Sequence, residues 1–304
     1  MRIEETSGLV AERPLGLPAT RARRAGGPRG VGAGGLASHL VLGAWGLLVA
    51  LPLAWMVMTA FKSDAEIFFS PWQLPGAWRW GNFARAWNEA QIGRYALNSL
   101  IVVAGSVSLT LLCASMAAYA LARYEFRLNR PIYYAFLVGL AFPGFLALVP
   151  VFFVVRDLGL LGTYRGLILV YSAGSLPFAV FFLTGFFRSL PTELAEAAIL
   201  DGASHHRVFF QIMLPMARPG LAAAGIFLFL DHWNQFILPF VLNPDPDRYL
   251  LAQGLAALAV QRGYESDWSA LFAGLTLTML PTLLFYLLFQ RRVQQGLTAG
   301  ALKG

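Results

Sequence analysis

The 304-residue sequence contains few charged residues. Asp, Glu, Lys and Arg make up 13% of it, about half of the roughly 25% that is usual in soluble domains. A run interrupted only by Asp231 and His232 spans 219–242, and runs with no Asp, Glu, Lys or Arg span 30–61, 95–122, 131–155, 166–187 and 268–290. Each run is at least as long as the roughly 20 residues that a helix needs to cross a bilayer. An ordinary soluble domain is therefore excluded.

Lysine and cysteine are also scarce. Lys62 and Lys303 are the only lysines, and neither follows a glycine, so the chain has no Gly-Lys-Ser/Thr loop for the phosphates of ATP. The single cysteine, Cys113, excludes a disulfide within the chain. The motifs HExxH and Gly-x-Ser-x-Gly and paired membrane aspartates are missing, which argues against an intramembrane enzyme. We predict no catalytic residue, metal or cofactor on this chain.

The charge-free runs predict the fold class. We expect an all-α, polytopic membrane protein with six transmembrane helices over residues 36–304 and a helical hairpin between the fourth and fifth helices. Residues 1–35 are rich in Gly, Arg and Pro and predict a disordered tail. Prolines inside the runs predict kinks, hinges or simple curvature at Pro143, Pro150, Pro177, Pro239 and Pro281.

The basic residues predict the orientation. Most of the 23 Lys and Arg residues fall in the first tail, the link 123–130, the loop 188–218 and the tail 291–304. Because cytoplasmic segments are enriched in basic residues, these segments and both termini are expected to be cytoplasmic. The net charge of +7 then reflects topology and contact with anionic lipids. Nucleic-acid binding is not expected, since no basic stripe with interleaved aromatics stands on a soluble domain.

The loop 188–218 is patterned as two short amphipathic helices. One face of the first carries Leu194, Ala197 and Ala198 at helical spacing. Gly202 suits the left-handed conformation that ends a helix, and Ser204 can cap the next one. The second helix has an apolar stripe and is expected to stop at Leu214 and Pro215. From periodicity alone, this hairpin either binds a partner or lies flat on lipid headgroups.

The sequence of the hairpin resembles a known motif. Residues 196–215, EAAILDGASHHRVFFQIMLP, are similar to the EAA loop of membrane subunits of binding-protein-dependent ABC importers. Further segments resemble the smaller permease subunit of maltose-type carbohydrate importers: 98–100, 117–123, Phe126, 143–144, 158–160, 186–191, 233–234, Phe236 and 296–304. Together these segments extend over most of residues 36–304.

The resemblance implies an importer permease for a mono-, di- or oligosaccharide, in a bacterial or archaeal cell membrane. Its partners would be a second homologous permease, an ATPase dimer that holds ATP and Mg, an extracytoplasmic sugar-binding protein and membrane lipids. The implied ATPase-coupling residues are Glu196, Ala197, Ala198, Asp201, Gly202, Ala203, Ile212, Leu214 and Pro215. An extended C-terminal tail would add a second ATPase contact through Gly296, Thr298, Gly300 and Lys303.

Two features have alternative interpretations. The cluster Asp231, His232, Trp233 and Asn234 lies inside an apolar run, and ionisable residues there usually face a cavity. It is a candidate substrate contact or, alternatively, a polar clamp between helices. Four tryptophans in the outer segment 62–94 fit a membrane-interface layer or a sugar-stacking surface: Trp72, Trp78, Trp80 and Trp87.

The sequence leaves alternatives to carbohydrate import. A permease for glycerol phosphate, amino acids or peptides is the nearest alternative, and a secondary transporter that needs no ATPase is a more distant one. The terminal run 296–304 favours carbohydrate. The particular sugar does not follow from the sequence.

Overall fold

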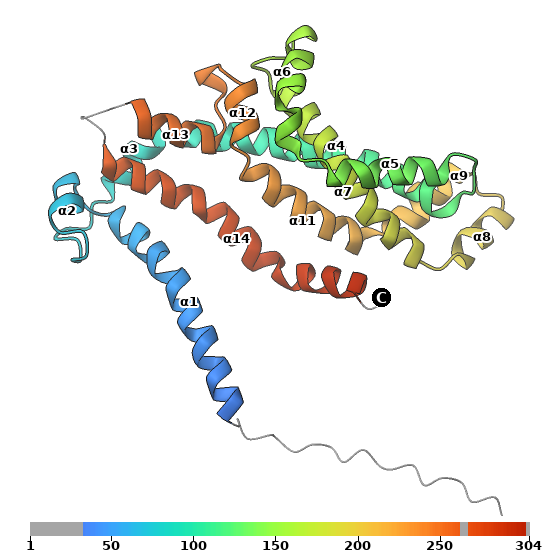
Figure 1. The fold of residues 1–304 in the computed structure, drawn as a ribbon, viewed down its shortest axis with the longest axis horizontal. Coiled ribbons are helices and arrows are strands. Elements are labelled where there is room, and N and C mark those ends of the chain that lie inside the picture. Colours follow the sequence, from blue (N-terminus) through green and yellow to red (C-terminus); the bar gives the residue numbers. More distant parts are fainter. Residues whose placement is uncertain (1–32, 262–266, 302–304) are drawn as a thin grey trace, which may run out of the picture. The chain divides into compact units, whose positions relative to one another are not determined.

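The structure is a computed structural model that describes residues 33–261 and 267–301. Within these ranges it consists of helices and turns without strands, as the sequence predicts. The chain divides into two compact units, residues 1–51 and 52–304. The elements that position the candidate sites belong to the second unit (Figure 1).

Four helices are long and apolar enough to cross a membrane. They are α1 (Ala33–Thr59), α4 (Ile92–Arg123), α7 (Tyr164–Ser189) and α14 (Trp268–Ala301). Two helix pairs pass the same test together, although each pair is sharply bent. The predicted six spans are reached only if each bent pair counts as one, but the chain is a multi-pass membrane protein on either count.

The third predicted span, 131–155, is wrong as a single helix. It is divided into α5 (Asn129–Ala141), the 3-10 turn η1 (Gly144–Ala147) and α6 (Leu148–Asp157), with a bend of 95° between the two arms. Pro143 explains the break, because proline has no N–H to donate and disfavours a helical conformation at the residue before it. Phe142 is accordingly extended, with ψ 124°.

The fifth predicted span, 219–242, is also wrong as a single helix. α11 (Arg218–Trp233) ends nine residues before the predicted end at residue 242. A separate short helix, α12 (Ile237–Leu242), forms the last part of the predicted span. The side chain of Asn234 donates to the carbonyl of Leu230 at 2.7 Å and so satisfies a terminal acceptor of α11. The chain continues through the 3-10 turn η3 (Pro246–Arg248) to α13 (Leu251–Gln261).

The C-terminal tail 291–304 was expected to be extended, and this is wrong for its described part. α14 remains helical through Ala301. The tail contains no proline, and its glycines each cost only about 1 kcal/mol relative to alanine inside a helix. An extended backbone is therefore not imposed by the sequence.

The outer segment between α1 and α4 contains α2 (Asp64–Phe69) and α3 (Gly81–Asn88). Lys62 is fully buried and donates to the carbonyls of Ser70 at 3.0 Å and Pro71 at 2.8 Å. The side-chain amide of Asn82 donates to the carbonyls of Ala60 and Lys62, both at 2.8 Å. These bonds tie the segment to the end of α1. Its tryptophans are exposed, so both of their interpretations stay open: Trp72, Trp78, Trp80 and Trp87.

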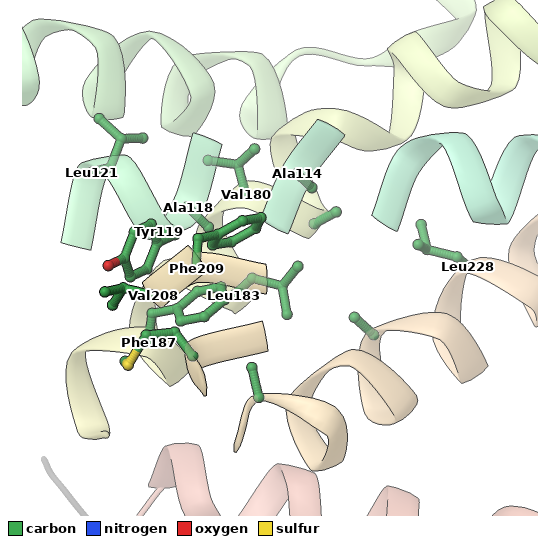
Figure 2. Close-up of a cluster of buried hydrophobic side chains, with 14 residues drawn as sticks. Ala114, Ala118, Tyr119, Leu121, Val180, Leu183, Phe187, Val208, Phe209 and Leu228 are labelled. Carbon is green, nitrogen blue, oxygen red and sulfur yellow. The ribbon is translucent and has the colours of Figure 1, made fainter. Parts of the chain in front are cut away.

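The main core forms where α4 and α7 lie along each other. Small residues of α4 permit this approach: a side-chain carbon added at Gly105 would lie 2.8 Å from Ile168 of α7. Figure 2 shows the cluster of buried side chains, which we call the hairpin core. It draws on α4, α7, the 188–218 hairpin and α11, and includes Ala118, Tyr119, Leu183, Phe187, Val208, Phe209, Met213 and Leu228.

We predict that Phe209→Ala destabilises the protein by about 3–5 kcal/mol, the usual cost of truncating a buried phenylalanine. Phe209 is 6% exposed, and its ring centroid lies 5.0 Å from that of Tyr119. The matched control is Phe210→Ala, because the neighbouring ring is 46% exposed and should be lost at much smaller cost. Unfolding of the purified protein in detergent measures both changes. Equal losses would contradict the assigned packing.

Glu66 of α2 holds the outer segment together. One carboxylate oxygen accepts hydrogen bonds from the backbone N–H and the hydroxyl of Ser63, both at 2.8 Å, and the other accepts from the N–H of Gly76 at 2.9 Å. These bonds to the charged form, that of the Ser63 amide first, lower the pKa of Glu66 from 4.5 to about 2. Because the folded pKa is depressed, the stabilisation is complete above about pH 4.5 and is lost as the pH falls toward 2.

We therefore expect residues 63–76 to open as the pH falls from about 4.5 to about 2. Hydrogen exchange of this segment, normalised to the intrinsic rate at each pH, measures the opening. Glu66→Gln should open the segment at every pH, whereas Glu89→Gln in the same outer segment should leave the pH response intact. A wild-type segment that stays equally protected across this range would refute the assignment.

Candidate functional site

The 188–218 hairpin is built from α8 (Glu193–Leu200) and α9 (His205–Arg207), which continues into the π-helical segment η2 (Val208–Met213) and α10 (Leu214–Met216). Single π-helical turns inside a helix frequently occur at functional sites. In Figure 1 the hairpin lies at one end of the 52–304 unit, and α3 and α13 lie at the other. A bend of 71° at Ala217 joins the hairpin to α11.

The turn of the hairpin has the predicted chemistry. Gly202 has φ +85°, the left-handed conformation that favours glycine. The N–H of Gly202 donates to Ile199 and that of Ala203 to Ala198, which closes the end of α8. The hydroxyl of Ser204 accepts from the N–H of Arg207 at 3.4 Å, as expected of an N-cap. Both predictions are confirmed.

The predicted end of the second helix at Leu214 and Pro215 is wrong by one residue. The helix runs on to Met216, and Pro215 lies in the first turn of α10, after the π-helical segment. The break falls instead at Ala217, immediately before Arg218 and Pro219.

The motif residues divide between two faces. One set is half-buried and faces the hairpin core: Ala198, Ala203, Ile212 and Leu214. Pro215 is half-buried as well. The other set is exposed: Glu196, Ala197, Asp201 and Gly202. One face therefore anchors the hairpin and the other remains available for contact.

The exposed face of α8 is both apolar and acidic. Leu200 is 88% exposed, and Leu194 and Ile199 are each nearly half exposed. The carboxylates of Glu193, Glu196 and Asp201 accompany them, and α8 itself carries no basic residue. Large exposed apolar side chains rimmed by polar ones are typical of a protein-binding surface.

Residues outside the motif hold the hairpin in place. A guanidinium nitrogen of Arg123, at the end of α4, donates to the carbonyls of Leu190 at 2.7 Å and Pro191 at 3.4 Å. The hydroxyl of Tyr124 lies 3.1 Å from Nδ1 of His205. The sequence marked Arg123 as a basic residue at the end of an apolar run and as the last residue of the permease-like segment 117–123. Its carbonyl partners lie 67 and 68 residues away, and no local pattern identifies them.

The polar cluster near the end of α11 is a clamp at His232. This side chain is 2% exposed, and its two ring nitrogens lie 2.8 Å from the hydroxyls of Ser106 on α4 and Ser175 on α7. The ring of Tyr171 packs 5.1 Å away. His232 thus joins three helices, as the clamp interpretation predicts.

The residues next to His232 in the sequence differ in their exposure to solvent. Asp231 and Asn234 are exposed, whereas Trp233 is 7% exposed and stacks on Phe229 at 5.5 Å. The indole nitrogen of Trp233 and the hydroxyl of Tyr171 are buried without a hydrogen-bond partner among the described residues. Buried donors normally have partners, so these two groups are exceptions among the described residues.

The proposed C-terminal contact is described only as backbone. Gly296, Thr298 and Gly300 lie in the helical part of α14, and Lys303 lies outside the described residues. Within the described part of the chain, no group of three His, Cys, Asp or Glu side chains is placed to hold a metal ion.

Comparisons of the sequence and the fold with known proteins show which proteins this chain resembles. Residues 110–299 match the family described as "Binding-protein-dependent transport system inner membrane component". A solved structure of a bacterial ABC transporter involved in the import of the acidic polysaccharide alginate covers 87% of this chain and 98% of its own, with a TM-score of 0.76. At 20% identity, that likeness bears on the fold alone.

Two curated relatives extend over nearly the same length. The diacetylchitobiose uptake system permease protein NgcG of Streptomyces coelicolor is 52% identical over 266 residues, 88% of each chain. The trehalose transport system permease protein SugB of Mycobacterium tuberculosis is 31% identical over 254 residues, 84% of this chain and 92% of that protein. The chain therefore belongs to the family of binding-protein-dependent transport system inner membrane components, the permease subunits of ABC importers.

Proposed function

We propose that this chain is the permease subunit of an ATP-driven importer of carbohydrates and forms half of the translocation pathway. The names of its relatives support a sugar, since the two compared above transport diacetylchitobiose and trehalose. A permease for another solute, such as glycerol phosphate, an amino acid or a peptide, is the alternative. The second permease, the ATPase dimer and the sugar-binding protein would be separate chains.

The observation that carries the proposal is the two-faced hairpin. Its inner face is fixed in the hairpin core by Val208, Phe209 and Met213, which are almost completely buried. Its outer face exposes Leu200 beside the carboxylates of Glu196 and Asp201. A surface of this kind can be gripped by another protein without unfolding the membrane helices behind it.

The charges on the hairpin favour a protein partner over the lipid surface. Helices that lie on a membrane usually carry Lys and Arg on their polar face, because anionic headgroups attract them. α8 instead carries Glu193 and Glu196, with Asp201 at its end, and no basic residue. We infer that α8 docks on the ATPase, which binds the ATP and Mg that this chain has no loop to hold.

The proposed mechanism follows the packing. Closure of the ATPase dimer would displace α8, and the displacement would pass through η2 to Phe209. From there it would reach Tyr119 of α4 and Phe187 of α7, which share the same buried cluster. Because protein cores are close-packed and hardly compressible, such a push moves whole helices rather than single side chains.

The proposal fixes the orientation of the chain. The hairpin and both termini would be cytoplasmic, and the tryptophan-rich segment with α2 and α3 would be external. The C-terminal residues Gly296, Thr298, Gly300 and Lys303 would add a second contact with the ATPase. This contact would be made by a helix as far as Ala301, rather than by an extended strand.

We propose that the residues of the polar cluster have different roles. His232 fixes α11 against α4 and α7, and Asp231 and Asn234 line the sugar pathway from the exposed side of the same helix. The unpartnered donors of Tyr171 and Trp233 lie beside the clamp and would donate hydrogen bonds to a sugar hydroxyl after a small movement of α11. Sugar hydroxyls need such partners when they leave water.

We predict that Gly202→Val lowers sugar uptake by about tenfold or more, since a β-branched residue at φ +85° adds roughly 1–3 kcal/mol of strain. Gly159→Val is the matched control: Gly159 has φ +68°, and, like Gly202, it has no neighbouring atom within 4 Å of an added side-chain carbon. The strain is comparable, but Gly159 lies between α6 and α7, outside the hairpin.

Uptake and ATPase stimulation by the loaded binding protein are measured in proteoliposomes that contain all partner subunits. The Gly159 variant should retain most of both activities. Normal uptake by the Gly202 variant, or equal losses in the two variants, would refute a coupling role for the hairpin.

We predict that His232→Ala destabilises the protein by about 1–3 kcal/mol, because the buried hydroxyl of Ser106 and the half-buried hydroxyl of Ser175 lose their shared partner. Asp231→Asn, on the exposed neighbour, should change the stability by less than about 0.5 kcal/mol and still reduce uptake. Thermal unfolding and uptake are measured on the same preparations. Full uptake by the Asp231 variant would remove Asp231 from the pathway and leave the cluster a clamp alone.

A further inference from the structure

A polar cavity of about 570 Å³ lies at the turn between α4 and α5. It is next to the first residues of the hairpin, which we call the root of the hairpin. Four arginines contribute to its lining: Arg123, Arg127, Arg130 and Arg188. Glu125 is the only carboxylate in the lining. We call this feature the arginine cavity.

The positive charge of the arginine cavity is not paired with carboxylates in the part of the chain that the structure describes. Among the residues that the structure describes, none of the four arginines forms an ion pair. Arg188 lies over the ring of Tyr133 at 5.2 Å, and the Nε of Arg123 is buried without a hydrogen-bond partner in the same described part. Several guanidinium groups around one cavity, with a donor left over, are suited to an anion with more than one oxygen.

The surroundings of the cavity indicate where this anion comes from. α5 begins at Asn129, within the cavity lining, and then exposes Ile132, Tyr134 and Val138. In a multi-pass membrane protein, such an exposed apolar helix faces acyl chains, and arginines at its end lie at the level of the headgroups. A phosphate in the cavity would therefore have its acyl chains along α5.

We propose that the arginine cavity binds the phosphate group of an anionic phospholipid headgroup. The guanidinium groups of Arg127 and Arg130, on the turn between α4 and α5, and Arg188, at the end of α7, hold the phosphate oxygens. The bound lipid thereby joins two segments that flank the hairpin.

This position connects the lipid to the hairpin. Arg123 lines the cavity and donates to Leu190 and Pro191, the residues from which the hairpin emerges. The side chain of Asn129 donates to the carbonyls of Leu121 and Tyr124 and so fixes the turn that carries Arg127. A headgroup in the cavity stabilises the root of the hairpin, while α8 stays free for its partner.

The test uses the complete transporter, freed of lipid in detergent and titrated with dioctanoyl phosphatidylglycerol. The zwitterionic phosphatidylcholine of the same chain length and inorganic phosphate are titrated in parallel, and native mass spectrometry counts the bound molecules. We expect saturable binding of phosphatidylglycerol in preference to both. Arg127→Gln/Arg130→Gln should weaken it at least about tenfold, since each arginine near an anionic lipid contributes about fivefold.

Arg207→Gln/Arg218→Gln is the matched control, because it removes the same charge from exposed positions outside the cavity and should leave the affinity close to wild type. Arg127→Lys/Arg130→Lys keeps the charge without the planar fork and should retain part of the affinity, which also tests the site if the glutamine variant does not fold.

Three outcomes overturn the proposal. Equal losses in the two glutamine variants would reduce the effect to general electrostatics, and preferential binding of inorganic phosphate would make the ligand a soluble anion. Binding that appears only after removal of the ATPase would assign the cavity to a protein contact. None of these outcomes depends on uptake, so failure here is distinguishable from failure of the coupling role of the hairpin.

Discussion

One half of the hairpin is buried in the core of the membrane helices, which fixes how the hairpin can move. Phe209 and Met213 belong to the same cluster as Phe187 of α7. This packing leaves the apolar side chains of α8 exposed, with Leu200 at its end. A protrusion anchored in this way can transmit a displacement, because it cannot move without moving the helices in which it is packed.

The membrane imposes a second constraint, on polar groups. Inside a bilayer no water satisfies a buried donor or acceptor, so each must find a partner in the protein. His232 does so through Ser106 and Ser175, and this single side chain ties α11 to α4 and α7. The groups left without a described partner, on Tyr171 and Trp233, lie next to this clamp. Two buried donors without a described partner therefore lie beside the residues proposed to line the sugar pathway.

The sequence predicted features that depend on local chemistry. Long apolar runs sufficed for the helices α1, α4, α7 and α14, and Gly202 and Ser204 sufficed for the turn of the hairpin. Features that depend on distant partners were missed. A proline such as Pro143 shows that a helix is weakened, but whether it bends slightly or by 95° is decided by packing against other elements. The prediction for the C-terminal tail was wrong for the opposite reason. The tail has few signals for a helix, and this scarcity was taken to indicate an extended chain, although the tail is helical through Ala301.

The candidate sites show the same division at the level of single residues. The motif 196–215 identified the hairpin, but a motif does not distinguish Ala198, which packs inward, from Ala197, which is exposed. The exposed face of α8 carries carboxylates, whereas the four arginines of the arginine cavity lie at the root of the hairpin. Opposite charges on adjoining surfaces direct anionic lipid to the root and away from α8. The proposed docking surface for the ATPase would thus be separated from anionic headgroups by electrostatics.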